Sequence, residues 1–425
     1  MASVPRSPIG RLLPRKVAPA VEDALGDTRV VLVNGARQCG KSTLVATIGN
    51  TRNAQWRSLD RTVTRQAAEF DPTEFVAGAE RLIIDEVQRV PELLLAIKEA
   101  VDSDPRPGRF LLTGSARVLG LRGLPDGLPG RMETIELWPL SQGEIDSSPD
   151  GFVDAIFAQG PAFHHTSAET RNSYIDRIVR GGFPEATART QRRRERFLDS
   201  YVADVINRDV IQLSEIERGP EMHALTRLIA ARSGQLLVLG TLGNVLGLPH
   251  PTVKRYVGWL EEVFLLKRIP PWSRNLSTRA VGTPKVAMVD SGIAANLLGL
   301  DASGLRQPSS PLGPLLEGFV AMEIARQLTW CEQRVDLYHY RTKDKVEVDI
   351  VLENRRGEVV AIDVKAASTV RGEDFRGIRH LADRIGDDLV AGIVLYTGEQ
   401  ALPFGPHFRA IPVGAVWEAA ADSAS

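Results

Sequence analysis

The feature that most constrains this 425-residue chain is a glycine-rich loop that reads Gly35-x4-Gly40-Lys41-Ser42. An apolar, β-rich run precedes the loop, and a helical pattern follows it. Glycines let a loop approach a phosphate closely, and the N–H groups at the start of a helix point toward it. A chance match is the alternative, but the flanking strand and helix argue against it. The residues predicted to bind ATP are Gly35, Ala36, Arg37, Gln38, Cys39, Gly40, Lys41, Ser42 and Thr43.

Within this loop, Lys41 is expected to reach the β- and γ-phosphates, and the hydroxyl of Ser42 to bind Mg2+. A second element, RLIIDEVQ, ends an apolar strand in Asp85 and Glu86. An aspartate at the end of a strand can hold Mg2+ through water, and an adjacent glutamate can polarise the attacking water. Asp-Glu pairs are also common on protein surfaces. The position of this Asp-Glu pair after a buried strand favours Asp85 as a metal ligand and Glu86 as a catalytic residue.

A third apolar strand, RFLLTGSA, ends in Thr113 and Ser115. A sheet that hydrolyses nucleotides keeps a polar residue near the γ-phosphate at this place. Ser115 or Thr113 is expected there, and Ser115 is the catalytic candidate. Thr-Gly-Ser also makes a good turn, which is the alternative interpretation.

Together these motifs resemble those of AAA+ ATPases, in particular a bacterial and archaeal branch with GxRQxGKT-, DEIQ- and LTGS-like motifs. The resemblance covers residues 15–215 and implies ATP hydrolysis with Mg2+. In that branch an LxGR segment follows the third strand, and here it reads LPGR, ending in Arg131. Arg131 is therefore the candidate arginine finger or sensor, and a plain surface arginine is the alternative. VRGGFPEA resembles a GGxP element that touches adenine, or equally forms a helix C-cap and turn.

The middle of the chain is mainly helical in pattern. The arginines of TQRRRERF would either meet phosphates or form the solvated face of a helix. Farther on, two helices around Gly-Leu-Pro, followed by LLKRIPPW, suggest a winged helix-turn-helix. The exposed side of its second helix would offer Thr252, Lys254 and Arg255, but also Glu261 and Glu262. DNA contact and protein docking therefore both stay open.

Near the C-terminus, the strands EVDIVLE and VVAIDVK flank the turn signal NRRG. In such a hairpin Asp349 lies opposite Asp363, and Lys365 shares a face with Asp363. Two carboxylates bind a hard cation such as Mg2+, and a nearby lysine can position or activate water. The pattern is similar to the PD-(D/E)xK nucleases, whose fold adds a glutamate from a preceding helix. The resemblance implies Glu317, Asp349 and Asp363 as metal ligands and Lys365 as catalytic, while a structural ion network is the alternative.

The composition is that of a soluble globular protein. A net charge of -1 predicts no global attraction to nucleic acid, so such binding must come from local patches. Two distant cysteines, Cys39 and Cys331, form neither a disulfide framework nor a metal cluster and fit a reducing cytoplasm. The N-terminal segment lacks the apolar run of a signal peptide, and no stretch is suited to span a bilayer. A cytoplasmic protein without membrane contact is expected.

The whole layout resembles the AAA-14 ATPases with a C-terminal DUF4143 region, through segments such as YIDRIVRGGFPEA, PKVAMVDSGIAANLLG and EVDIVLE. The expected fold is α/β, with a P-loop AAA+ core, a helical lid, a winged-helix domain and an α/β restriction-endonuclease-like domain.

Cys39 departs from the small or β-branched residue that is usual at its position in the glycine-rich loop of this family, and its oxidation is expected to affect ATP binding. The expected domains are an N-terminal arm (1–25), ATPase core (26–140), lid or connector (141–215), winged helix (216–275) and nuclease-like domain (276–425).

The predicted function is an ATP-hydrolysing protein that couples its nucleotide state to a nuclease-like domain acting on nucleic acid. The alternative is an ATP-operated regulatory switch, of a defence or toxin–antitoxin type, that binds a protein partner or DNA without cleavage. A transcription factor that binds ATP would require sequence-specific contacts from residues 250–265. Assembly of several copies is also compatible with the motifs.

Overall fold

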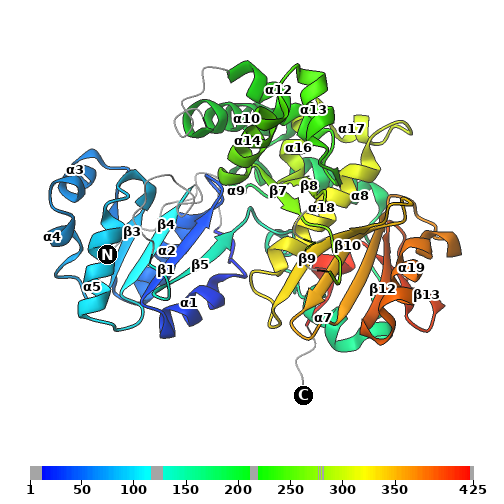
Figure 1. The fold of residues 1–425 in the computed structure, drawn as a ribbon, viewed down its shortest axis with the longest axis horizontal. Coiled ribbons are helices and arrows are strands. Elements are labelled where there is room, and N and C mark those ends of the chain that lie inside the picture. Colours follow the sequence, from blue (N-terminus) through cyan, green and yellow to red (C-terminus); the bar gives the residue numbers. More distant parts are fainter. Residues whose placement is uncertain are drawn as a thin grey trace. The chain divides into compact units, whose positions relative to one another are not determined.

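The computed structural model describes residues 12–115, 128–210, 219–275, 277, 279 and 282–421 (Figure 1). The packing of the chain divides it into two units. The first unit consists of Met1–Pro139 and Glu262–Phe264, and the second of Leu140–Glu261 and Leu265–Ser425. In the part of the chain that the structure describes, no helix is both long and apolar enough to cross a membrane.

The first unit is built on a five-stranded sheet with the strand order β2-β3-β4-β1-β5. Every neighbouring pair in it is parallel. The strands β1, β3 and β4 are buried at every position, as expected for parallel strands that are covered on both faces. Their bounds are β1 Val30–Gly35, β2 Gln55–Ser58, β3 Leu82–Asp85, β4 Phe110–Gly114 and β5 Met132–Leu137.

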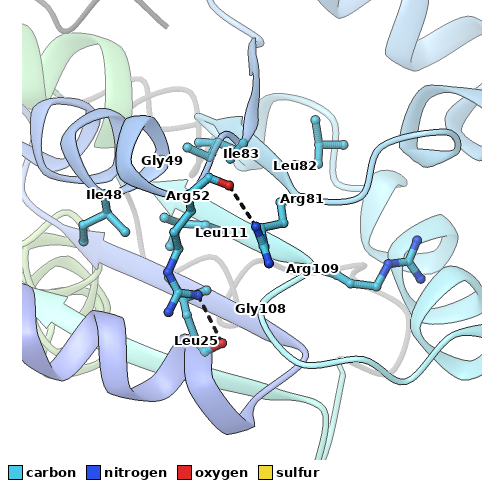
Figure 2. Close-up of a pocket in the computed structure, with 11 residues that line it drawn as sticks. Leu25, Ile48, Gly49, Arg52, Arg81, Leu82, Ile83, Gly108, Arg109 and Leu111 are labelled. Carbon is cyan, nitrogen blue, oxygen red and sulfur yellow. Dashed lines mark hydrogen bonds between the residues drawn. The ribbon is translucent and has the colours of Figure 1, made fainter. Parts of the chain in front are cut away.

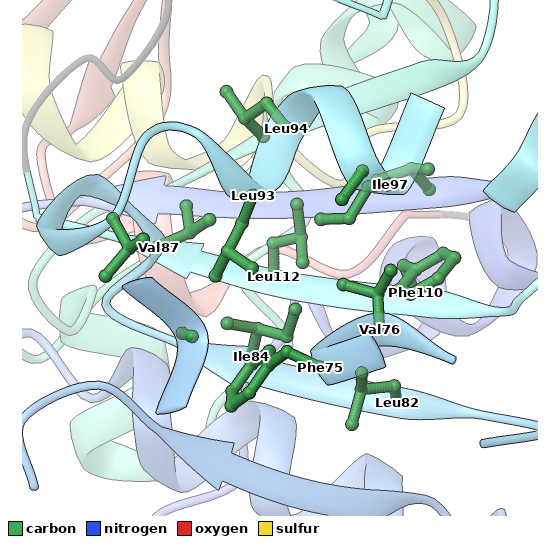
Figure 3. Packing of buried hydrophobic residues seen from close by; sticks show 14 of the residues in the cluster. Phe75, Val76, Leu82, Ile84, Val87, Leu93, Leu94, Ile97, Phe110 and Leu112 are labelled. Carbon is green, nitrogen blue, oxygen red and sulfur yellow. The ribbon is translucent and has the colours of Figure 1, made fainter. Parts of the chain in front are cut away.

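Helices cover both faces of this sheet. Alternate residues of β3 and β4 pack with residues of α4 and α5 in one apolar cluster, in which Leu93 and Ile97 lie near Leu112 and Phe110 (Figure 3). On the other face α2 comes so close that a Cβ added to Gly49 would lie 2.1 Å from Cδ1 of Ile83. The helices are α1 Ala18–Asp27, α2 Lys41–Thr51, α3 Thr62–Phe70, α4 Pro72–Val76 and α5 Leu93–Ser103.

The second unit contains a small antiparallel sheet with the order β6-β8-β7. Along the chain its parts follow one another as helix, strand, two helices and two strands. Gly247, at a φ of 66°, ends α13 in the left-handed conformation and opens the turn to α14. The bounds are α12 Gly219–Ala230, β6 Gln235–Leu236, α13 Leu239–Leu246, α14 His250–Glu262, β7 Leu266–Ile269 and β8 Lys285–Met288.

A six-stranded mixed sheet with the order β13-β14-β12-β11-β10-β9 forms the C-terminal part of the second unit. The strands β9, β10 and β11 are antiparallel neighbours, whereas β11, β12 and β14 run parallel. Helix α18 precedes β9, and α19 connects β11 to β12. The bounds are α18 Leu312–Gln327, β9 Val335–Arg341, β10 Glu347–Asn354, β11 Val359–Lys365, α19 Arg376–Ile385, β12 Leu389–Tyr396, β13 Leu402–Gly405 and β14 Phe408–Pro412.

The segment expected to form a lid or connector, 141–215, contacts this C-terminal part through α6 and α8. The N–H of Gln142 donates to Oε2 of Glu323 (2.8 Å), and the ring of Tyr174 meets Trp417 edge-on. The packing therefore joins the predicted lid, winged helix and nuclease-like domain in one unit. The other helices of this unit are α6 Gln142–Asp146, α7 Phe152–Gln159, α8 Arg171–Arg180, α9 Pro184–Thr187, α10 Gln191–Asp204, α16 Ser291–Leu297, α17 Ala302–Leu305 and α20 Ala415–Glu418, with a π-helical turn at Val205–Val210.

Close packing of α19 on β10 generates a first prediction. A Cβ added to Gly377 would lie 1.9 Å from the carbonyl oxygen of Glu347. Backbone cannot give way as a flexible side chain does, so Gly377→Ala should lower the free energy of unfolding by about 1–3 kcal/mol. Gly258, within α14, faces open space, and Gly258→Ala should instead raise it by about 0.4–1 kcal/mol. Denaturant unfolding of both variants measures this, and equal effects would contradict the packing described.

Burial of His339 on β9 generates a second prediction. Its Nε2 lies 3.1 Å from the carbonyl oxygen of Thr283. Burial, with the nearby charges of Lys285 and Arg341, lowers the pKa of His339 from 6.5 to about 4, against the opposing effect of Asp349. The unfolded chain therefore binds a proton that the folded chain excludes, and stability falls as the pH drops from 6.5 toward 4.

The loss should reach about 3 kcal/mol at most. His339→Gln should flatten the pH dependence of the unfolding midpoint in this range, because the group that takes up the proton is gone. His164→Gln, which removes an exposed imidazole, is the matched control and should leave the slope unchanged. An unchanged slope in His339→Gln would show that another group causes the dependence.

Candidate functional site

The glycine-rich loop leaves β1 at Gly35 and enters α2 at Lys41. Gly35 is required because a Cβ there would lie 2.0 Å from the carbonyl oxygen of Leu137, and Gly40 has a φ of 102°. The buried ammonium of Lys41 donates to the carbonyl oxygens of Gly35 (3.0 Å) and Ala36 (2.8 Å). These hydrogen bonds hold the lysine side chain against the loop, at the N-terminus of α2, where the backbone N–H groups favour an anion.

Two neighbours hold the loop against the end of β5. The guanidinium of Arg15 donates hydrogen bonds to the carbonyl oxygens of Cys39 and Trp138, each at a distance of 2.7 Å. The thiol of Cys39 is fully buried, with Sγ 3.3 Å from the carbonyl oxygen of Leu137. This burial keeps the thiol from solvent and counts against the predicted sensitivity to oxidation. The sequence pattern did not point to Arg15.

Asp85 is the centre of a hydroxyl cluster at the carboxyl edge of the sheet. Its Oδ1 accepts hydrogen bonds from Ser42 Oγ (2.8 Å) and Thr113 Oγ1 (2.7 Å), and its Oδ2 accepts one from Ser58 Oγ (3.3 Å). Burial raises the pKa of Asp85, while the hydroxyls of Thr113 and Ser42 oppose that shift. Ser58 was missed in the sequence, although it ends β2 directly beside Asp85 in the parallel register.

Glu86 follows in a left-handed conformation, with a φ of 62°. This conformation is costly for a residue with a Cβ, and such residues cluster at functional sites. The N–H of Glu86 donates to Thr113 Oγ1 (2.9 Å), so one hydroxyl joins Asp85 and Glu86. The side chain of Glu86 accepts hydrogen bonds from Ser115 Oγ, at 2.7 and 2.8 Å, and from the amide of Gln88. The predicted residues Lys41, Ser42, Asp85, Glu86 and Ser115 thus gather at one edge of the sheet.

Arg131 lies at the opposite edge. It directly precedes β5, whose first residue pairs with Val30 at the start of β1, whereas the nucleotide loop follows the end of β1. Its Nε donates to Oδ1 of Asp102 at 2.5 Å. Parallel strands place this position a full strand length from the loop, so Arg131 does not serve the site of its own unit. An arginine-finger role would require the site of a second copy.

A small cavity of about 10 Å³ also lies toward this opposite edge. Three arginines line it together with residues of α1, α2, β3 and β4, and Arg81 donates to the carbonyl oxygen of Arg52 at 3.0 Å (Figure 2). The third, Arg109, donates to the carbonyl oxygens of Ala100 and Asp104. The cavity holds about one water molecule and cannot accept a nucleotide.

The predicted adenine-contacting element, VRGGFPEA, lies in the second unit as a helix cap and turn. Gly181 ends α8 at a φ of 66°, and a Cβ there would lie 2.4 Å from Asp290 Oδ1. The N–H of Gly182 donates to Asp290 Oδ2 (2.6 Å), and Asp290 also caps α16 by accepting from Ile293 N (3.0 Å). The two glycines therefore serve packing around a buried carboxylate, which is the alternative that the sequence left open.

A second polar cluster lies on the six-stranded sheet. The register that pairs Ile350 with Ile362 sets Asp349 opposite Asp363, as the hairpin pattern predicted. Asp363 Oδ1 accepts from the N–H of Asp349 (3.1 Å), and Asp349 Oδ2 accepts from the N–H of Val364 (3.0 Å). Both carboxylates are buried, and burial raises the pKa of Asp363.

A residue that the sequence analysis missed, Lys285 of β8, enters this cluster. Its ammonium donates to Asp349 Oδ1 (2.9 Å) and forms an ion pair with Glu317 of α18. Burial alone would lower the pKa of Lys285, but the charges of Asp349 and Glu317 outweigh it and raise that pKa. Burial, with the Asp349 charge, raises the pKa of Glu317 despite the ammonium. Lys365 ends β11 and is half-buried.

The predicted metal site at Glu317, Asp349 and Asp363 is therefore not present in the expected form. Among the described residues, no group of three or more His, Cys, Asp or Glu side chains is arranged to hold a metal ion. The physical reason is the ammonium of Lys285, which takes one oxygen of Asp349 and one of Glu317. No local sequence pattern predicts this contact of Lys285, because the residue reaches the cluster from a different sheet.

On α14, Lys254 and Arg255 are exposed, as the helical pattern predicted, whereas Thr252 and Glu262 are half-buried and Glu261 is buried. Glu261 is occupied by Arg268 of β7, whose Nε donates to it at 2.6 Å. On α10, the exposed arginines are Arg192, Arg193 and Arg196, whereas Arg194 donates to the carbonyl oxygens of Ala186 and Arg189.

Three family models match the chain in succession: an AAA domain (27–146), a domain of unknown function named DUF8612 (171–304) and a domain of unknown function named DUF4143 (312–416). Two mycobacterial proteins, the uncharacterized protein Rv2008c of Mycobacterium tuberculosis and Mb2031c of Mycobacterium bovis, are each 29% identical over 406 residues. These alignments cover 94% of this chain and 83% of either relative.

Among solved structures, the chain is similar to the Walker-type ATPase of Pyrococcus abyssi, with 16% identity and a TM-score of 0.43, over 67% of this chain and 95% of that one. It is also similar to the RuvB Holliday junction branch migration motor of Thermotoga maritima, with 20% identity and a TM-score of 0.29, over 60% of this chain and 88% of that one. With the nucleotide loop, the family matches identify residues 27–146 as a P-loop domain of the AAA type and residues 312–416 as a DUF4143 domain.

Proposed function

We propose that this protein hydrolyses ATP with Mg2+ and that its nucleotide state switches the binding of nucleic acid by the second unit, without cleavage. The single observation that carries the ATPase part is the hydroxyl cluster around Asp85, with Glu86 beside it and Lys41 in the loop. These are the groups that hydrolysis of a phosphoanhydride needs, at one edge of one sheet.

The donor atoms fit Mg2+. The hydroxyl oxygen of Ser42 and the carboxylate of Asp85 are hard oxygen ligands 2.8 Å apart, and neither has a cationic partner among the hydrogen bonds of this cluster. When bound, Mg2+ would neutralise charge on the β- and γ-phosphates. Lys41 would exchange its bonds to loop carbonyls for phosphate oxygens.

Glu86 is the expected general base. Its carboxylate would accept a proton from the attacking water while Ser115 and Gln88 fix its orientation. Thr113 is a positioning residue, because its hydroxyl donates to Asp85 and accepts from the N–H of Glu86. That single hydroxyl couples the metal-binding carboxylate to the base.

Two features of the second unit support nucleic acid as the partner. The order of α12, β6, α13, α14, β7 and β8, with β8 central in the sheet, is the order expected of a winged helix, whose second helix in DNA-binding versions enters the major groove. That helix, α14, exposes Lys254 and Arg255. A chain of net charge -1 needs such a local basic patch to bind phosphates.

The second candidate function is an ATP-controlled nuclease. The order of α18, β9, β10, β11, α19 and β12 is that expected for a PD-(D/E)xK-like fold, and Asp349 and Asp363 stand opposite each other. The ammonium of Lys285 between Glu317 and Asp349 disfavours it. Cleavage of DNA or RNA with Mg2+ or Mn2+ that disappears in Asp363→Ala would establish this candidate over the first.

A prediction for the ATPase concerns Thr113. Thr113→Val keeps the shape of the side chain but leaves the N–H of Glu86 without its acceptor, so kcat for ATP hydrolysis should fall about tenfold or more. KM for ATP should change little, since Lys41 and the loop are untouched. Thr113→Ser keeps the hydroxyl and should retain most of the rate. Steady-state phosphate release measures both, and a wild-type kcat in Thr113→Val would refute the assigned role.

A prediction for the switch concerns α14. Binding of labelled duplex and single-stranded DNA of mixed sequence is followed by fluorescence anisotropy in two nucleotide states. The first is the protein with ADP, and the second is a Glu86→Gln variant that is expected to bind ATP without hydrolysing it. The two nucleotide states should differ in affinity by about fivefold or more. Lys254→Glu with Arg255→Glu should weaken binding about tenfold or more and reduce its salt dependence.

The matched control is Arg371→Glu, which reverses a charge on a side chain that is 79% exposed elsewhere in the second unit. It should leave DNA affinity nearly unchanged. Equal loss in the control would indicate a nonspecific charge effect, and no binding in either nucleotide state would favour a protein partner instead.

A further inference from the structure

A buried ammonium group lies inside the carboxylate cluster of the second unit. The side chain of Lys285 is only 5% exposed, and its two carboxylate partners, Glu317 and Asp349, are 18% and 10% exposed. Nζ of Lys285 is 2.9 Å from Asp349 Oδ1 and is also paired with Glu317 Oε1. A cation therefore already lies between two acids that come from a helix and a strand.

Backbone N–H groups engage two further carboxylate oxygens of the cluster. Asp349 uses its Oδ2 for the N–H of Val364, at 3.0 Å, so both of its oxygens are occupied. Asp363 turns its Oδ1 to the N–H of Asp349, at 3.1 Å. A divalent cation that lies between Glu317 and Asp349 would have to displace the ammonium, because the ammonium holds one oxygen of each.

The backbone of Lys285 is fixed on both sides. Lys285 lies in the central strand of the three-stranded sheet, where it pairs with Leu236 of β6 and with Ile269 of β7. Its other neighbours are also rigid, since Glu317 lies in the middle of α18 and Asp349 in the strand β10. Removal of the ammonium from the cluster therefore means leaving a buried charge without partners, which is strongly unfavourable.

We infer that Lys285 is an internal cation that takes the place of a divalent metal in this cluster, so that Glu317 and Asp349 bind a lysine rather than Mg2+. The cluster is then a structural tie between β8, α18 and β10 and holds no hydrolytic metal. This inference does not depend on the nucleotide site, because every residue in it belongs to the second unit.

The test is Mn2+ binding to the full chain without nucleotide, measured from the electron paramagnetic resonance signal of free Mn2+. Four proteins are compared: wild type, Asp349→Asn, Lys285→Met and the double variant Lys285→Met with Asp349→Asn. Methionine is chosen because it is unbranched, flexible and uncharged. Mn2+ bound elsewhere, for example at Asp85, is the same in all four and cancels in each comparison.

Wild type and Asp349→Asn should bind equal amounts of Mn2+. Lys285→Met should gain an Mn2+ site that depends on Asp349, with an affinity about tenfold or more above that of the wild type at this cluster. The double variant should lack this site. Addition of Mn2+ should also raise the melting temperature of Lys285→Met and leave that of the double variant unchanged.

Two results would overturn the inference. One is wild-type Mn2+ binding that Asp349→Asn abolishes, and this comparison stands even if Lys285→Met does not fold. The other is a folded Lys285→Met protein that gains no site, which would show that these acids do not form a cation position. ATP turnover, measured on the same four proteins, reports separately on the nucleotide site and is expected to be equal in all.

Discussion

The parallel alignment of the strands in the first unit is the constraint on which its chemistry depends. Because β1, β3 and β4 run in one direction, their carboxyl ends meet at one edge, and Gly35, Asp85 and Thr113 arrive there from distant parts of the chain. Burial of these strands also desolvates Asp85. Three hydroxyls satisfy its oxygens, so the apolar packing that stabilises the sheet holds a polar group in a fixed position.

The two units satisfy their buried carboxylates in different ways, and the difference has chemical consequences. Hydroxyl groups stabilise the ionised form of Asp85 but leave its charge uncancelled, so the site still attracts a cation. The ammonium of Lys285 cancels charge on Asp349 and Glu317, so their attraction for a further cation is reduced. An aspartate in a buried strand thus predicts a metal ligand in one unit and an ion pair in the other.

Local patterns predicted much of this arrangement. The loop before α2 and the pairing of Asp349 with Asp363 follow from short motifs and from the two-residue period of strands. Contacts between distant segments did not follow: Lys285 reaches its acids from another sheet, and Ser58 meets Asp85 only through strand order. The contacts of α6 and α8 with C-terminal residues did not follow either, since this packing leaves no trace in the periodicity of either helix.

The tie through Lys285 also bears on how the second unit can respond to ATP. Lys285 joins the three-stranded sheet to α18 and to the six-stranded sheet, and Asp290, two residues after β8, joins α16 to the turn at Gly182. Separating these parts would expose or orphan buried charges, a cost of several kcal/mol that differential binding of one nucleotide over another rarely supplies. A nucleotide-driven change is therefore expected to act on the second unit as a whole. The helix α14, with its exposed Lys254 and Arg255, would then change its accessibility or orientation together with the second unit, rather than by local rearrangement.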